Sequence, residues 1–294
     1  MRPRTLLVIL KVRQPGKDVG WRPPVECRVG IGPLLALLLI VAPPPVRADD
    51  LSSLFDPNTI VSVGGFVGAG PRFQSSREVG LWGLPYLSFR KVDEPREWWS
   101  PDDALDATLI GQGRVQAGVV LDVRDSRHLS DDRRLAGLPR LPVTVGLGLF
   151  GEVWPIADTL RLRAEVTQGI RAHDGLVAKL GADLVGRFGR FTLSAGPRFV
   201  LGDDAAMRLD FDVPVRTAIV NPSLGPYCAK GGPRSGGATA AVSYDLTEAW
   251  QIFSYVRYDR LIASASDSPI TRRIGTPNQL TVATGAIYSF PLNP

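Results

Sequence analysis

The chain has 294 residues, with 34 Lys and Arg against 29 Asp and Glu, a formal net charge of +5, 31 glycines, 25 prolines and only two cysteines. The basic residues alternate with acidic ones and form no Lys/Arg stripe on a predicted helix, which argues against a nucleic-acid-binding protein. Mean hydropathy is close to zero, and after residue 50 no apolar run is long enough for a membrane-spanning helix. Any membrane crossing must therefore be made by strands.

Residues 1–48 are predicted to be a signal peptide. A short apolar stretch, residues 33–41, follows basic residues, and Val46-Arg47-Ala48 places small residues at the positions that signal peptidase reads. We therefore expect export and a mature chain that begins at Asp49. The segment before the apolar stretch is long for a signal peptide, which indicates that translation starts further along, near Val29.

The mature part, residues 49–294, is predicted to be one all-β domain. Its strands are expected where apolar and polar residues alternate with a period of two. About 12 such segments, within a range of about 10–14, are found by this criterion. In chain order they are residues 59–67, 79–90, 105–111, 115–123, 143–153, 160–167, 176–185, 191–199, 207–213, 238–246, 250–260 and 279–290.

The alternation is clearest in the three segments between residues 160 and 199. In the first of them Leu160, Leu162 and Val166 fall on one face, while charged residues fall on the other. The polar faces of the three segments carry a charge ladder of six residues: Arg161, Arg163, Glu165, Lys179, Asp183 and Arg198. A soluble sheet would turn this face to water, whereas a transmembrane barrel would turn it to the lumen and the apolar face to lipid.

The fold class that we expect is all-β, an antiparallel transmembrane β-barrel of about 12 strands. A sandwich with this many strands would be expected to carry larger aliphatic residues and fewer alanines and glycines on its inner faces. A barrel tolerates small residues and removes exposed sheet edges. The longer connections, residues 124–142, 214–237 and 261–278, are expected on the outer side of the membrane.

Two interpretations of the charge ladder are open. Its members could pair with one another across neighbouring strands and fill a narrow barrel, since unpaired buried charges are costly. Alternatively, they could line a pore that selects small polar solutes. Because both signs alternate on adjacent strands, we favour pairing.

Several aromatic residues are candidates for the membrane interface. Trp82 and Tyr86 lie in the second predicted strand, where interfacial aromatics are common. Trp98 and Trp99 lie in a proline-containing connection, residues 91–101, which we expect either to cap the barrel or to contact lipid headgroups.

The chain offers little for catalysis or metal binding. Its two histidines, His128 and His173, have no serine or cysteine nucleophile at a suggestive spacing, although a hydrolase barrel could assemble such a set in space. Cys27 lies in the predicted signal peptide, so Cys228 is expected to be a lone loop residue without an internal disulfide. Asp203-Asp204 is expected in a solvated turn. No enzyme activity, metal or cofactor is predicted.

Several stretches together point to a known family. In chain order they are Arg161-Leu-Arg-Ala-Glu-Val, Gly169-Ile-Arg-Ala-His-Asp-Gly-Leu-Val-Ala, Leu193-Ser-Ala-Gly-Pro-Arg-Phe, Gly202-Asp-Asp, Tyr244-Asp-Leu-Thr-Glu-Ala-Trp, Tyr258-Asp-Arg-Leu, Asp267-Ser-Pro-Ile and Gly275-Thr-Pro-Asn-Gln. From about residue 65 to residue 290 the chain resembles the MipA/OmpV family of Gram-negative outer-membrane proteins. It departs from the family pattern over residues 211–227 and at its end, where Phe290 is followed by four more residues in place of a terminal aromatic.

The resemblance implies a non-enzymatic barrel in the outer membrane, embedded in its lipid. It implies a scaffold in peptidoglycan maintenance that brings a murein lytic transglycosylase together with a peptidoglycan synthase. Other members of the family are linked to solute passage, so a porin-like channel for small solutes is the alternative function.

Overall fold

The computed structural model describes residues 58–93, 96, 98–124, 126–170 and 175–292. The predicted signal peptide and His173 lie outside these residues. Among the described residues, no helix is long and apolar enough to cross a bilayer.

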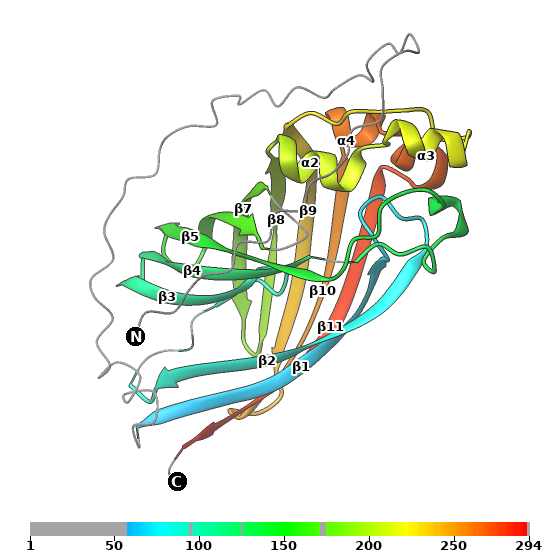
Figure 1. Cartoon of the computed structure of the whole chain (residues 1–294). Coiled ribbons are helices and arrows are strands. Elements are labelled where there is room, and N and C mark those ends of the chain that lie inside the picture. Colours follow the sequence, from blue (N-terminus) through cyan, green and yellow to red (C-terminus); the bar gives the residue numbers. More distant parts are fainter. Residues whose placement is uncertain (1–57, 94–95, 97, 125, 171–174, 293–294) are drawn as a thin grey trace, which may run out of the picture.

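The described part of the chain is built on one sheet of eleven antiparallel strands (Figure 1). The strands are β1 (Thr59–Pro71), β2 (Val79–Lys91), β3 (Leu105–Gln112), β4 (Val115–Arg124), β5 (Thr144–Ile156), β6 (Leu160–Gly169), β7 (Leu176–Phe188), β8 (Phe191–Gly202), β9 (Gly232–Asp245), β10 (Trp250–Leu261) and β11 (Asn278–Pro291). Their spatial order is β2-β1-β11-β10-β9-β8-β7-β6-β5-β4-β3, so the first strand pairs with the last. The all-β antiparallel prediction is confirmed, and the sheet curls into a half-barrel.

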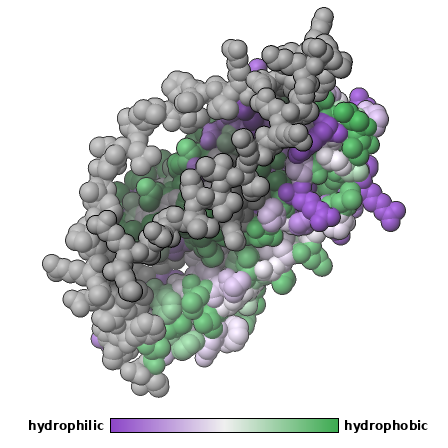
Figure 2. Space-filling model, viewed as in Figure 1, coloured by the Kyte–Doolittle hydropathy of each residue, from purple (hydrophilic) through white to green (hydrophobic). Residues whose placement is uncertain are grey.

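The two faces of the strands differ as the alternation predicts. In β6 the side chains of Arg161, Arg163 and Glu165 are buried, while Leu162 and Val166, at the alternate positions, are about two-fifths exposed. The same alternation places Leu180 and other large apolar side chains of the neighbouring strands on the exposed surface. On the visible face in Figure 2, apolar residues lie over the strands and hydrophilic residues gather toward the helical end. The sheet thus has an apolar outer face and a charged inner face.

The sheet does not close by hydrogen bonds among the described residues, because β2 and β3 are its two edges. All neighbouring strands are antiparallel, so the two end strands of an eleven-stranded row run in the same direction. Parallel strands cannot be joined by a tight hairpin and need a connection that travels the length of the strand. Residues 92–104 make this connection, and the expectation that the barrel leaves no exposed edge is not met.

One predicted strand is wrong. Residues 207–213 were expected to be extended, but most of them belong to helix α2 (Asp204–Phe211). Asp203 is the N-cap of this helix, and its side chain accepts a hydrogen bond of 2.8 Å from the backbone N–H of Ala206. The pair Asp203-Asp204 is therefore a helix start, not a solvated turn.

The long connections gather at one end of the strands and pack together (Figure 1). They contain α2, α3 (Val215–Val220), α4 (Ala263–Asp267), a short 3-10 helix, η2 (Arg133–Leu135), and a π-helical turn, η3 (Ile270–Ile274). A buried apolar cluster draws one or more residues from each connection: Phe73, Leu135, Val213, Leu224, Ile270 and Ile274. These connections form a folded cap at that end.

At the opposite end the connections are short turns, residues 113–114, 157–159, 189–190 and 246–249, beside the start of β1 and the end of β11. Gly113 has φ +66° in its turn, a conformation that favours glycine. Long connections at one end and short turns at the other are typical of outer-membrane barrels.

Cys228 lies in the capping region and is disulfide-bonded, so the expectation of a lone thiol is wrong for this structure. The chain's other cysteine, Cys27, lies outside the described residues.

Candidate functional site: the charged inner face

The inner face of β5 to β8 carries oppositely charged residues in register. Arg163 lies opposite Glu152 of β5, Arg161 opposite Asp183 of β7, and Glu165 opposite Lys179. Opposite charges that face each other across an antiparallel pair stabilise the pairing of the strands. The period-two pattern therefore produces a wall of complementary charge.

Arg161 is the centre of this wall and is almost fully buried, with 1% of its surface exposed. Its guanidinium group lies 2.6 Å from Asp103, 2.7 Å from Glu152 and 3.2 Å from Asp183. The group also sits over the ring of Trp98, 5.2 Å from the centroid. The three carboxylates offset the charge of this buried cation, although its Nε makes no hydrogen bond.

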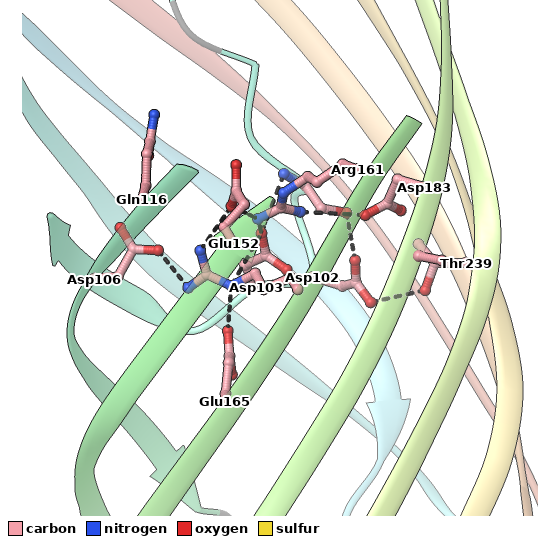
Figure 3. A network of polar contacts seen from close by, with 12 residues as sticks. Asp102, Asp103, Asp106, Gln116, Glu152, Arg161, Glu165, Asp183 and Thr239 are labelled. Atoms are coloured by element: carbon pink, nitrogen blue, oxygen red, sulfur yellow. Dashed lines mark hydrogen bonds and ion pairs between the residues drawn. The ribbon is translucent and has the colours of Figure 1, made fainter. Parts of the chain in front are cut away.

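Arg163 forms a second cluster with Asp106, Glu152 and Glu165, and Figure 3 labels these three partners beside Arg161. Arg163 pairs with Asp106, with Glu152 at 3.2 Å and with Glu165 at 2.8 Å. Its guanidinium carbon lies 4.0 Å from the centroid of the Phe150 ring. Glu152 contacts both arginines and links the two clusters.

The connection between β2 and β3 folds into this interior, and we call residues 98–104 the inner segment. Ser100 to Asp103 make a turn in which the N–H of Asp103 donates to the carbonyl of Ser100 over 3.0 Å. Serine at the first position and Pro101 at the second are typical of such turns. The turn presents the adjacent carboxylates of Asp102 and Asp103 to the wall (Figure 3).

Asp102 is held by three neighbouring strands. Arg198 of β8 contacts both of its carboxylate oxygens at 2.9 Å. Thr239 of β9 donates a hydrogen bond of 2.7 Å, and Arg257 of β10 lies 3.1 Å away. Within the turn, the hydroxyl of Ser100 donates over 2.6 Å. Asp102 thus anchors the inner segment to β8, β9 and β10, which lie in the middle of the strand order, away from the edge strands β2 and β3.

Aromatic side chains complete the packing of the inner segment. The ring of Trp99 stacks on Tyr86 at 5.2 Å and meets the buried Phe253 edge-on at 5.3 Å. Trp98 meets the buried Trp154 edge-on at 5.9 Å. Of the two alternatives predicted for the Trp98-Trp99 pair, a barrel cap or contact with lipid headgroups, these inward ring contacts argue against the second.

The neighbouring prediction for Tyr86 and Trp82 fails in the same way. Trp82 lies on the same face of β2 as Tyr86 and packs edge-on against Phe66 at 5.7 Å. The rings of Phe66 and Phe253 are in turn 5.6 Å apart. Both predicted interface aromatics belong to the inner packing.

The structure places all six residues of the predicted ladder on the inner face and gives each an oppositely charged partner. Lys179 stands apart, paired with Asp122 of β4 at 2.7 Å. Sequence reasoning missed Asp102, Asp103 and Asp106 as members of the same network. The Ser-Pro-Asp-Asp sequence indicates a turn, but no periodic pattern indicates that the turn points inward.

Among the described residues, no group of three or more His, Cys, Asp or Glu side chains is arranged to hold a metal ion. The acidic residues of the interior are engaged by arginines, so they are not presented as a ligand set.

An antiparallel sheet with an apolar outer face, a charged inner face and long connections at one end defines a protein of the outer-membrane barrel class. The family model described as "MltA-interacting protein MipA" matches residues 63–290. The chain belongs to the MipA family, which confirms the resemblance found in the sequence.

A search of curated proteins found no match. Among solved structures, Pseudomonas putida OprB at high pH is 9% identical, with 81% of this chain and 96% of that chain covered and a TM-score of 0.38. The NanC porin is 9% identical, with 78% and 98% covered and a TM-score of 0.35. Vibrio cholerae OmpT is 9% identical, with 80% and 98% covered and a TM-score of 0.30.

Proposed function

We propose that this protein is a structural barrel of the Gram-negative outer membrane that acts as a scaffold in peptidoglycan maintenance. One observation carries the structural part of the proposal. The charged side chains of the inner face are paired with one another and with the inner segment, so the interior is occupied by the protein itself. A filled interior suits a structural role better than an open conduit.

The scaffold part rests on the family, whose description names MltA, a lytic transglycosylase. The partners are a murein lytic transglycosylase and a peptidoglycan synthase, bound through the short turns or the N-terminal segment. Periplasmic enzymes meet an outer-membrane barrel at the end with the short turns. The cap at the other end faces outward.

The partner test uses the purified protein in detergent, immobilised through a tag on the cap, with a lytic transglycosylase and a synthase of the same envelope added singly and together. We expect both enzymes to be retained. The double variant Asp158→Lys with Glu248→Lys reverses two charges in the short turns and should weaken retention of both enzymes. The matched change Asp267→Lys in the cap should leave retention unchanged. If neither enzyme is retained, the scaffold role is overturned.

A small-solute channel is the second candidate, and one observation favours it. Among the described residues, the sheet has two edge strands, β2 and β3, that do not pair with each other. Liposomes containing the protein are compared with empty vesicles for swelling in sugars and amino acids of increasing size. Vesicles that do not swell, containing a folded and heat-modifiable protein, support the structural role, whereas size-dependent swelling supports the channel.

The export step belongs to the same proposal. We expect cleavage after Ala48, which would leave a mature chain that starts at Asp49. N-terminal sequencing of the protein from outer-membrane fractions measures where the mature chain begins. An uncleaved chain in these fractions would contradict the export model.

The scaffold is non-enzymatic in this proposal. A hydrolase barrel would turn over ester or lipid substrates and lose this activity in His173→Ala. We expect no turnover by the wild type above a detergent blank, and turnover abolished by His173→Ala would favour the hydrolase.

A further inference from the structure

The carboxylate of Asp102 is bound by the barrel wall in the manner of a ligand. Four donor atoms converge on it, Nε and Nη2 of Arg198, Oγ1 of Thr239 and Nη1 of Arg257, at 2.7–3.1 Å. The Asp102 side chain is only 3% exposed. All four donors belong to strands, while the carboxylate belongs to a connection.

These donors are suited to carboxylates in general. The planar fork of an arginine matches the two oxygens of a carboxylate, and Arg198 uses it in this way with Asp102. The second arginine and the hydroxyl complete the shell around one oxygen, Oδ2. A free carboxylate of the same size would meet the same four donors.

The wall holds its arginines in place without help from Asp102. Arg198 pairs with Asp183 at 2.7 Å, and Arg257 pairs with Asp259 at 2.6 Å. Gly181 lies opposite Arg198 in the sheet, and a Cβ there would come within 3.3 Å of Nη1, so the glycine leaves room for the guanidinium group. The donors are therefore preorganised by the strands.

We propose that Arg198, Thr239 and Arg257 form a carboxylate-binding site on the inner wall, occupied in the resting barrel by Asp102 of the same chain. Small solutes that carry a carboxylate are the class of ligand that would fill the site when the Asp102 carboxylate is absent from it. A small cavity beside the site is lined by Asp102, Arg198 and Arg257 among others. This inference goes beyond the scaffold role and does not depend on it.

Removing the Asp102 carboxylate should leave three donors, Nε of Arg198, Oγ1 of Thr239 and Nη1 of Arg257, without this acceptor, while Nη2 of Arg198 keeps Asp183. Losing the acceptor of buried donors destabilises a protein unless something replaces it. A ligand that binds only the folded state raises the unfolding temperature with its concentration. Formate is the smallest probe that supplies a carboxylate and nothing else. Chloride supplies charge without the fork geometry, and formamide supplies the shape without the charge.

The experiment compares wild type, Asp102→Ala and the matched cap variant Asp267→Ala in detergent, each with formate, chloride or formamide at constant ionic strength. We expect formate alone to raise the unfolding temperature of Asp102→Ala in a dose-dependent manner. Wild type and Asp267→Ala should not distinguish the three solutes. The double variant Asp102→Ala with Arg257→Gln should lose most of the response to formate.

An equal response of folded Asp102→Ala to formate and chloride would overturn the proposal. If Asp102→Ala folds only when formate is present during refolding, the refolding yield itself supports the site. If it folds in neither solution, Asp102→Asn is compared in the same way at higher formate, and no preference for formate over chloride would then overturn the site. The partner test on the wild type is separate, so the scaffold and the site can fail independently.

Discussion

The charged wall on β5 to β8 and the inner segment that packs against it contribute to one ion-pair network by different means. The wall places a charge at every second residue of a strand, so Arg161, Arg163 and Glu165 must share a face. The inner segment is irregular and brings Asp102 and Asp103 inward through one turn between two edge strands. A regular element thus supplies most of the cations, and an irregular one completes their neutralisation.

The difference teaches where the stability of such an interior resides. Arginines on strands are fixed by the sheet, but the neutralisation of their charge depends partly on a connection that is not itself part of the sheet. The predictions below test whether wall and segment act as one unit.

The largest effect is expected from Arg161→Ala, which leaves the carboxylates of Asp103, Glu152 and Asp183 without their shared cation. Breaking a buried ion pair on one side costs about 3–5 kcal/mol. Urea unfolding in detergent measures the loss. The matched control is Arg187→Ala in the exposed pair with Asp158, for which about 0–1 kcal/mol is expected. Similar losses in both variants would show that the network adds no special stability.

The outer face supplies the next largest effect. Leu180 is 45% exposed in the middle of β7, where we expect lipid. A lipid-facing arginine at mid-membrane costs about 2–4 kcal/mol, so Leu180→Arg should lower the free energy of unfolding in lipid vesicles by that amount. Leu246→Arg, in a short turn at similar exposure, is the control and should cost about 0–1 kcal/mol. Equal tolerance of both changes would argue against a lipid-facing β7.

A double-mutant cycle between Asp103 and Arg161 sharpens the comparison directly, because the two groups lie 2.6 Å apart across segment and wall. The change Asp103→Asn keeps the shape and removes the charge. We expect a coupling energy of about 0.5–3 kcal/mol with Arg161→Ala in the unfolding measurement. The distant pair of Asp103→Asn with Arg187→Ala should be additive within about 0.5 kcal/mol. Additivity in both cycles would mean that the segment rests against the wall without contributing to it.

The sequence predicts the regular elements of this structure better than its irregular connections. Period-two alternation identified all eleven strands of the sheet. It also predicted that the six ladder residues share a face. It failed for residues 207–213, where apolar residues alternate by coincidence and the N-cap signal of Asp203 decides the outcome. A capping residue acts through one hydrogen bond, which a pattern of hydropathy does not register.

The inner segment could not be predicted for a related reason. Its direction is set by tertiary partners, chiefly the arginines of β6, β8 and β10, which are far from it in sequence. For its two tryptophans, Trp98 and Trp99, the sequence left open a barrel cap or lipid contact, because composition alone cannot distinguish an interfacial ring from one packed inside. Only the parallel direction of β2 and β3 requires a crossing connection, and that direction follows from the strand count.

The smallest expected effect concerns Asp212, which lies in the cap and not in the wall. Burial raises the pKa of this carboxyl, although the backbone N–H of Ala229, 2.5 Å from Oδ1, acts in the opposite direction. A raised pKa means that the folded state binds the proton more tightly than the unfolded state. The stability from this group is therefore complete below the unfolded pKa and is lost as the pH rises through the folded one.

The variant Asp212→Asn keeps an oxygen that can accept from Ala229 and removes the charge. We expect it to be slightly more stable than the wild type at pH 7, by up to about 1 kcal/mol, and indistinguishable from it near pH 3. Amide hydrogen exchange of the cap at several pH values measures the difference where it arises. Asp267→Asn, in an exposed pair with Arg272, should show no such pH-dependent gain. A loss of stability in Asp212→Asn at pH 7 would mean that the hydrogen bond from Ala229 outweighs the cost of burying the charge. The cap would then depend on a buried anion, as the wall depends on its buried cations.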